Sequence, residues 1–184
     1  MKNQIIELLN DDNLDFPPLK NALADPNGLL AVGGDLSVKR LKAAYQAGIF
    51  PWYSDGDPIM WWSPDPRGII LIEKLRINKT LRKVLTQKKF TVTLNQAFDR
   101  VINYCADAPF RKEETWIVDE MLYAYQNLHK NGIAHSIEVW MDGELSGGLY
   151  GVAINGYFSG ESMFYNKSNG SKIALVYLSE LLKS

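Results

Sequence analysis

Residues 134–164 read AHSIEVWM-DG-ELSGGLYGVAI-NG-YFSGESMF, three segments rich in apolar, aromatic and β-branched residues. The dipeptides Asp142-Gly143 and Asn155-Gly156 separate the segments. Because both dipeptides tolerate the positive φ angles that a two-residue type I′ turn requires, each predicts a tight hairpin. We therefore expect residues 134–141, 144–154 and 157–164 to form an antiparallel three-stranded meander.

The segments around the meander predict a mixture of helices and strands. Strands are expected at 68–72 and 90–94, and helices at 78–88, 96–106, 118–131 and about 169–182. The last of these is almost entirely apolar between residues 173 and 182. A helix that is apolar nearly all round should be buried on more than one side.

The first third of the chain predicts a separate small domain. Ser37 is a suitable helix N-cap, Leu36 and Leu41 occupy the positions of a hydrophobic staple, and Gly48 can end the helix, so residues 37–47 should be helical. Prolines then interrupt the chain up to Pro66. We expect an N-terminal domain at 1–66 and a second domain at 67–184.

A meander followed by a helix is the central part of an acetyltransferase-like (GNAT) α+β fold. In such folds another strand follows the helix and lies parallel to the last meander strand, whereas here the sequence stops soon after the helix. We therefore expect either that another subunit covers the helix or that this is a C-terminally truncated form. An uncovered sheet edge would favour self-association.

The composition excludes several classes of protein. The 184 residues are 46% hydrophobic and 22% charged, with a net charge of −1, which is ordinary for a soluble domain. No run is long and apolar enough to cross a membrane. The single cysteine, Cys105, excludes an internal disulfide, and the two histidines, His129 and His135, have no zinc-site spacing. A cytoplasmic protein without a metal is expected.

Charge is distributed unevenly along the chain. Residues 74–89 contain basic residues and no acidic one. This segment could bind a phosphate backbone. Judged by charge alone, however, a run of basic residues is explained more simply as the solvated face of a helix.

Several stretches resemble one known family. They are PNGLLAVGGDLS at 26–37, AYQAGIFPW at 44–52, WWSPDPR at 61–67 and GESMF at 160–164, with Ser171-Lys172 beyond. In order and spacing these residues are similar to those of the bacterial leucyl/phenylalanyl-tRNA–protein transferases. The resemblance covers nearly the whole chain, although family members continue for about another quarter of its length.

The resemblance implies an aminoacyltransferase. Such an enzyme moves leucine or phenylalanine from aminoacyl-tRNA to the N-terminal Lys or Arg of an acceptor protein and so marks the acceptor for degradation. Discrimination against methionine should be weak, since small differences between apolar side chains are worth little in a pocket. The tRNA is a substrate, and no cofactor is implied.

The resemblance also implies roles for individual residues. Glu161 would be the catalytic carboxylate, hydrogen-bonded to an amino group of a substrate. The apolar pocket for the donor side chain would comprise Trp52, Trp116, Leu149, Phe158 and Met163. Independently of the resemblance, the spacings of three and four residues put much of the set Arg76, Lys79, Arg82 and Lys83 on one helix face, which suits a tRNA stem, and the start of the last helix at Ser171 and Lys172 could hold a 3′-terminal phosphate. For Leu149 and Met163 taken alone, ordinary core packing is the preferred explanation.

Two other hypotheses remain open at this stage. A truncated chain could bind tRNA or a partner without catalysing transfer. Alternatively, an acyl-CoA-dependent N-acyltransferase of the same fold could act on small amines, but only Gly170 lies in the loop where such enzymes have a glycine-rich pyrophosphate site.

Overall fold

The computed structural model describes residues 6–10, 12–107 and 117–183 of the chain. The chain divides into two compact units. The first unit comprises residues 1–68 and 114–127, and the second comprises residues 69–113 and 128–184. Within the described residues no helix is long and apolar enough to cross a bilayer. The structure is of the α+β class, with an N-terminal unit and largely antiparallel sheets.

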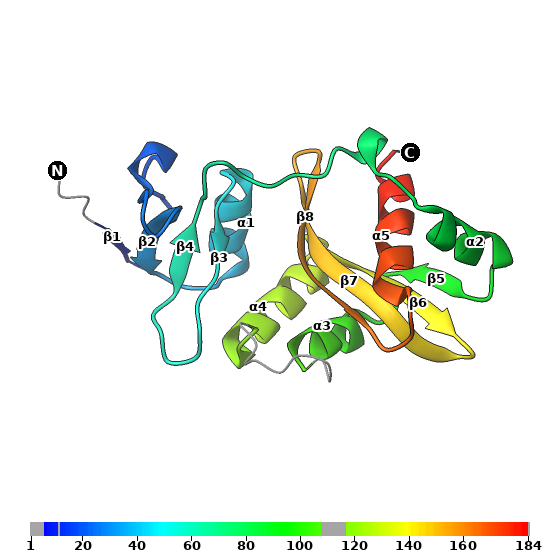
Figure 1. The fold of residues 1–184 in the computed structure, drawn as a ribbon. Coiled ribbons are helices and arrows are strands. Elements are labelled where there is room, and N and C mark those ends of the chain that lie inside the picture. Colours follow the sequence, from blue (N-terminus) through cyan, green and yellow to red (C-terminus); the bar gives the residue numbers. More distant parts are fainter. Residues whose placement is uncertain (1–5, 11, 108–116, 184) are drawn as a thin grey trace. The chain divides into compact units, whose positions relative to one another are not determined.

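The first unit has a small mixed sheet, a short 3-10 helix and α-helices (Figure 1). Its strands lie in the order β1-β2-β4-β3, and only the β1–β2 pair is parallel. In chain order the elements are β1 (Glu7–Leu9), η1 (Leu19–Asn21), β2 (Leu29–Gly33), α1 (Val38–Gln46), β3 (Phe50–Pro51), β4 (Met60–Trp62) and most of α4 (Asp119–Lys130).

The predicted N-cap and the glycine that ends helix α1 are confirmed. The Ser37 hydroxyl accepts the backbone N–H of Arg40 at 3.3 Å, and Gly48 has a φ of +77° just beyond the helix. Trp61 on β4 is fully buried, and its indole N–H donates to the Gly33 carbonyl at 2.8 Å. These bonds satisfy polar groups that burial would otherwise leave without partners.

A buried arginine joins α1 to the N-terminal strand region. Arg40 Nε lies 3.2 Å from Asp35 Oδ2, and Arg40 Nη2 donates to the carbonyls of Asn10 at 2.7 Å and Asn13 at 2.9 Å. Burial alone would raise the pKa of Asp35, but hydrogen bonds from Ser37 and Arg40 outweigh burial and lower it. The charged pair therefore holds the chain segment after β1 against the start of α1.

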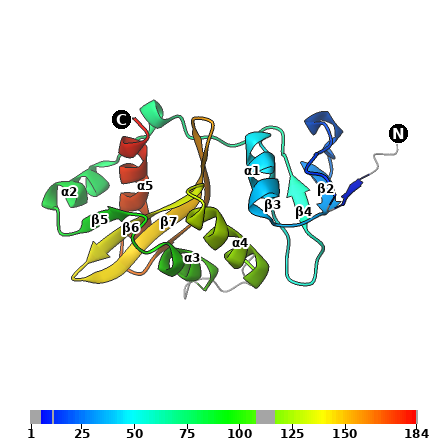
Figure 2. The same cartoon turned by 180° about the vertical axis from the view of Figure 1, so that it is seen from behind.

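The second unit is built on a four-stranded antiparallel sheet in the order β5-β6-β7-β8. Figure 2 shows from behind that α2 lies beside α5. The elements are η2 (Ile72–Lys74), α2 (Lys79–Gln87), β5 (Thr91–Leu94), α3 (Phe98–Ala106), β6 (Ala134–Met141), β7 (Glu144–Ile154), β8 (Tyr157–Tyr165) and α5 (Gly170–Leu181).

The predicted meander is confirmed as β6-β7-β8. Asp142, Gly143, Asn155 and Gly156 all have positive φ, as the two type I′ turns require. The helices expected around the meander are present with bounds that differ by one or two residues. The strand expected at 68–72 is wrong, because Ile69, Ile70 and Leu71 are exposed and pair with no strand.

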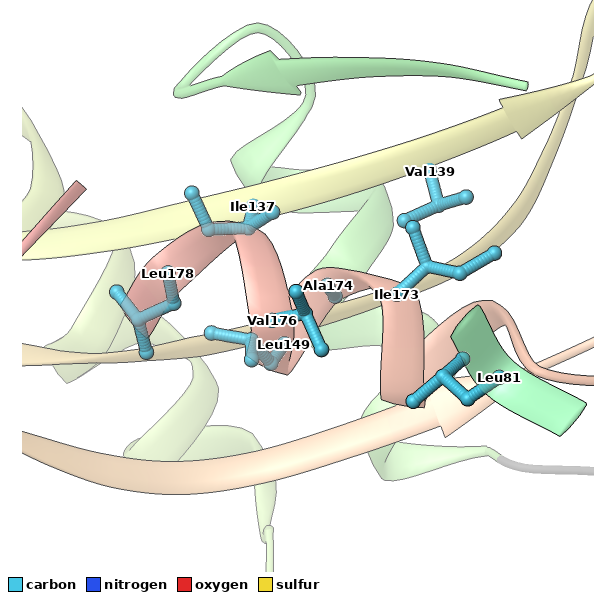
Figure 3. Packing of buried hydrophobic residues seen from close by; sticks show 8 residues of the cluster. All are labelled: Leu81, Ile137, Val139, Leu149, Ile173, Ala174, Val176 and Leu178. Atoms are coloured by element: carbon cyan, nitrogen blue, oxygen red, sulfur yellow. The ribbon is translucent and has the colours of Figure 1, made fainter. Parts of the chain in front are cut away.

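The sheet lies between helices on its two faces. Gly148 and Phe164, which are register partners, face α3, where Phe164 stacks on Tyr104. The alternate residues on the strands face α5 and form an apolar cluster with it (Figure 3). The cluster comprises Leu81, Ile137, Val139, Leu149, Ile173, Ala174, Val176 and Leu178. Burying each of the larger side chains contributes about 1.5–3 kcal/mol, which fixes α2 and α5 against the sheet.

Candidate functional site

Glu161 lies at an irregularity in the β7–β8 ladder. Tyr150 pairs with Ser162 and Gly151 pairs with Gly160, so Glu161 is an extra residue on β8 between these two register pairs. This is a β-bulge, a feature that bends a strand and redirects its side chains, often beside functional sites. The Glu161 side chain is partly exposed. The one carboxylate predicted to be catalytic therefore occupies the point where the sheet departs from regular geometry.

Three predicted pocket residues share the face of the sheet that α5 covers in part. Leu149 and Met163 are register partners, and Phe158 pairs with Ala153 further along the same two strands. Directly opposed residues lie on one face, and alternate residues along a strand return to that face. Leu149 is buried, Phe158 is half-buried and Met163 is 43% exposed. The three side chains form an apolar surface that extends from the core to solvent.

Gly151 allows Phe158 to lie close to the sheet. A Cβ placed on Gly151 would lie 2.5 Å from Cε1 of the Phe158 ring and would overlap the Ser159 carbonyl oxygen. The ring therefore packs directly over the glycine backbone. At the opposite position on β8, a Cβ placed on Gly160 would meet no atom within 4 Å. On this face the Phe158 ring thus covers Gly151, whereas the space above its register partner Gly160 is open.

The basic residues of α2 gather on one face of the helix. Lys79, Arg82 and Lys83 line an open depression together with Thr86 and Gln87. The opposite face of α2 buries Leu81 in the apolar cluster. No carboxylate among the described residues forms an ion pair with these cations. Their charges are therefore exposed and not neutralised by a neighbouring carboxylate.

Arg76 stands apart from this face, since it precedes the helix cap Asn78 and is exposed. Ser171 and Lys172 lie in the first turn of α5, which no side chain caps. Ser171 is only 8% exposed, whereas Lys172 is exposed. Apart from Arg76, the tRNA-binding candidates therefore lie on α2 and α5, two helices that neighbour one another in the second unit.

The start of α5 is held in place by contacts with β7 and the β6–β7 turn. A Cβ on Gly170 would lie 2.5 Å from the Ser146 carbonyl oxygen, so the helix begins in backbone contact with β7. Lys167 Nζ lies 2.9 Å from Asp142 Oδ2 and 3.6 Å from Glu144 Oε2. The hydrogen bond that Lys167 donates to Asp142 is the main reason that the pKa of Lys167 is raised. Lys167 is thus engaged within the protein.

Of the two tryptophans predicted to line the pocket, the structure describes Trp52. Trp52 belongs to the first unit, where it is 49% exposed and its carbonyl accepts the Trp62 indole N–H at 2.6 Å. Next to it, the Tyr53 hydroxyl donates to Glu120 Oε2 at 3.3 Å, and burial together with Glu120 raises the pKa of Tyr53. Trp116 lies outside the described residues.

Sequence reasoning missed the buried carboxylate of Glu138 in the centre of the second unit. It accepts hydrogen bonds from the hydroxyls of Thr93 and Ser136 and from the backbone N–H groups of Gln96 and Ala97 at the start of α3. The alternation of Ser136 and Glu138 places both on one face of β6. That pattern alone normally indicates a solvent-facing strand, so burial was not predictable from it.

Comparisons with known proteins cover both units. Residues 69–184 match the family model described as leucyl/phenylalanyl-tRNA protein transferase, and residues 34–65 match the model of its N-terminal domain. A leucyl/phenylalanyl-tRNA–protein transferase of Colwellia psychrerythraea is 60% identical over 98% of this chain and 77% of its own length. Those of Pseudoalteromonas translucida and Pseudoalteromonas atlantica are 52% and 54% identical and are covered over 76% and 77% of their lengths.

Proposed function

The chain belongs to the leucyl/phenylalanyl-tRNA protein transferase family, and we propose that it transfers leucine or phenylalanine from aminoacyl-tRNA to the N-terminal Lys or Arg of acceptor proteins. Such transfer marks the acceptor for degradation under the N-end rule. Discrimination against a methionyl donor is expected to be weak. The observation that supports this proposal best is the position of Glu161 at a β-bulge beside the apolar face of Leu149, Phe158 and Met163.

The reaction itself demands little covalent chemistry from the protein. The neutral α-amine of the acceptor attacks the ester carbonyl carbon, a peptide bond forms, and the carbon–oxygen bond to the tRNA ribose breaks. The tRNA leaves with a free hydroxyl, which receives a proton, and the attacking nitrogen loses one. Because the ester is already activated, positioning and proton transfer can supply most of the acceleration. No cofactor is needed for these steps.

Glu161 is assigned the role of the group that hydrogen-bonds the reacting or donor amine. A carboxylate suits this role because it accepts hydrogen bonds from an ammonium group and can assist the loss of a proton. The apolar side chains of Leu149, Phe158 and Met163 would receive the donor side chain, with Trp52 and Trp116 completing the pocket. Aromatic rings with a thioether form a wall that adapts to leucine and phenylalanine alike.

The tRNA would be bound mainly through its phosphates. Lys79, Arg82 and Lys83 present unneutralised charge on one face of α2, and Arg76 lies just before the helix. A double-stranded RNA stem is recognised by its shape and backbone more than by sequence, which such a face suits. Lys172, with Ser171 beside it, would contact the 3′ end from the first turn of α5.

The fold family of the two domains and the cellular compartment of the reaction are part of the same proposal. The β6-β7-β8 meander followed by α5 is assigned to an acetyltransferase-like (GNAT) domain at 67–184, preceded by a small domain at 1–66. Because aminoacyl-tRNA is the donor, the reaction would take place in the cytoplasm. No bound metal is invoked at any step.

A transfer assay tests the proposal directly. The protein is incubated with radiolabelled Leu-tRNA or Phe-tRNA and a peptide that begins with Arg, and label in the peptide is measured. The same peptide with an acetylated N-terminus is the matched control, since it lacks the attacking amine. We expect label only in the free peptide. Absence of label with both donors, while the tRNA still binds, would support the hypothesis of a non-catalytic tRNA-binding chain.

A further inference from the structure

Gly160 is a glycine that the fold itself does not require. Among all fourteen glycines of the chain, every one of which the structure describes, only Gly68 and Gly160 have neither a positive φ nor an atom within 4 Å of an added Cβ. Gly68 lies in an irregular segment of the first unit. Gly160 lies inside strand β8, where glycine is less favourable than alanine because it costs more backbone entropy.

The surroundings of Gly160 indicate what its missing side chain leaves free. Its register partner is Gly151, over which the Phe158 ring packs, and Glu161 follows at the bulge. Leu149 and Met163 flank the glycine pair on the same face. Residues two apart on a strand are separated by about 7 Å, so the bare position has roughly the width of one amino-acid side chain. Gly160 itself is exposed.

We propose that Gly160 is a specificity-determining residue: the open space above its backbone admits the aminoacyl group of the donor, between Phe158 on one side and Met163 on the other. This inference rests on the proposed function and extends it, since the size of the side chain at position 160 would determine which aminoacyl groups the site can admit. A side chain here would project into the space that the substrate needs without touching the rest of the protein. We therefore attribute the glycine at this position to substrate binding and not to folding.

Gly151 provides the matched comparison, because it is the register partner of Gly160 and is constrained in the opposite way. Gly151→Ala would force a new Cβ into the Ser159 backbone and the Phe158 ring. It should therefore lower Tm. Gly160→Ala should leave Tm unchanged or raise it by up to about 3 °C, since alanine restricts the unfolded chain. The two substitutions thus separate a glycine required by packing from one required by a substrate.

The test uses two stable donor analogues, adenosine carrying leucine or phenylalanine through a 3′-amide in place of the ester. Their affinity for the wild type, Gly160→Ala and Gly160→Val is measured by calorimetry, beside the Tm of each protein. We expect binding to weaken about tenfold for alanine and further for valine, since one methyl group in such a pocket is worth roughly tenfold or more. The loss should be larger for the phenylalanine analogue.

The outcomes separate this inference from the proposed function. If Gly160→Val binds both analogues as the wild type does, the inference is wrong, whether or not transfer occurs. If the wild type binds neither analogue, there is no donor site at Gly160 and the inference is wrong as well. A third outcome is that the wild type binds the analogues, the Gly160 variants bind them more weakly, and the wild type transfers nothing to peptides. In that case the inference stands and the proposed transferase activity does not.

Discussion

Thr93 and Glu138 are direct partners across the β5–β6 ladder, and the Thr93 hydroxyl donates to the Glu138 carboxylate at 2.5 Å. The same carboxylate accepts the backbone N–H groups of Gln96 and Ala97, so it ties β5, β6 and the start of α3 together. We expect Glu138→Ala to destabilise the protein by about 4 kcal/mol, because several buried donors lose their acceptor at once. Urea unfolding monitored by circular dichroism measures this.

Thr93→Ser is the control for that measurement. It keeps the hydroxyl that donates to Glu138 and removes only one methyl group, so the loss should stay below about 1 kcal/mol. A Glu138→Ala protein whose unfolding midpoint stays within the range of the control would show that the carboxylate contributes little to the second unit.

The environment of His135 should make the free energy of unfolding depend on pH. Burial is the main cause of its lowered pKa, and the nearby His129 lowers it further, while a backbone hydrogen bond with Gly132 acts the other way. The ring nitrogen Nδ1 lies 2.9 Å from the Asn95 amide nitrogen, which donates only to an unprotonated ring. Below pH 6.5 the unfolded chain therefore binds more protons than the folded one.

Stability should thus fall as the pH is lowered from 7 to 5, with a contribution from His135 of at most about 1.4 kcal/mol per pH unit. His135→Gln removes this titration and should flatten the profile over that range. Equal slopes in the wild type and the variant would assign the acid sensitivity to other groups. Urea unfolding at a series of pH values decides between them.

Much of the second unit was predictable because its signals are local. The Asp142-Gly143 and Asn155-Gly156 turns define the meander, and Asn78 caps α2 by accepting the Leu81 N–H at 2.8 Å. The apolar run at 68–72 was misinterpreted because a strand needs a neighbour to pair with, and a sequence window does not contain that information.

The candidate site was predictable as a set of residues but not as an arrangement. Glu161 could be singled out by resemblance, yet its place at a bulge depends on the register of two strands. The burial of Glu138 and the open space at Gly160 likewise depend on residues distant in the sequence. Properties that arise from pairs of elements therefore required coordinates.

Glu161→Gln should separate catalysis from folding. The amide has nearly the size of the carboxylate but cannot take up a proton from an amine, so transfer should fall by at least about 100-fold. Binding of the tRNA should change little, because the basic face of α2 is untouched. Glu180→Gln is the control, since Glu180 is an exposed carboxylate on α5 that pairs with Lys183 near the end of the same helix. Wild-type transfer by the Glu161 variant would remove this residue from the mechanism.

The basic face of α2 predicts a change in the salt dependence of tRNA binding. Each phosphate contact releases about one counterion, so the double variant Arg82→Ala/Lys83→Ala should reduce the slope of log K against log salt concentration by about 1–2 and weaken binding at low salt. Lys39→Ala/Lys42→Ala removes the same charge from exposed positions on α1 and serves as the control. Filter binding between 50 and 200 mM salt measures both slopes. If the two double variants behave alike, the effect is one of net charge, and α2 is no more than a solvated helix face.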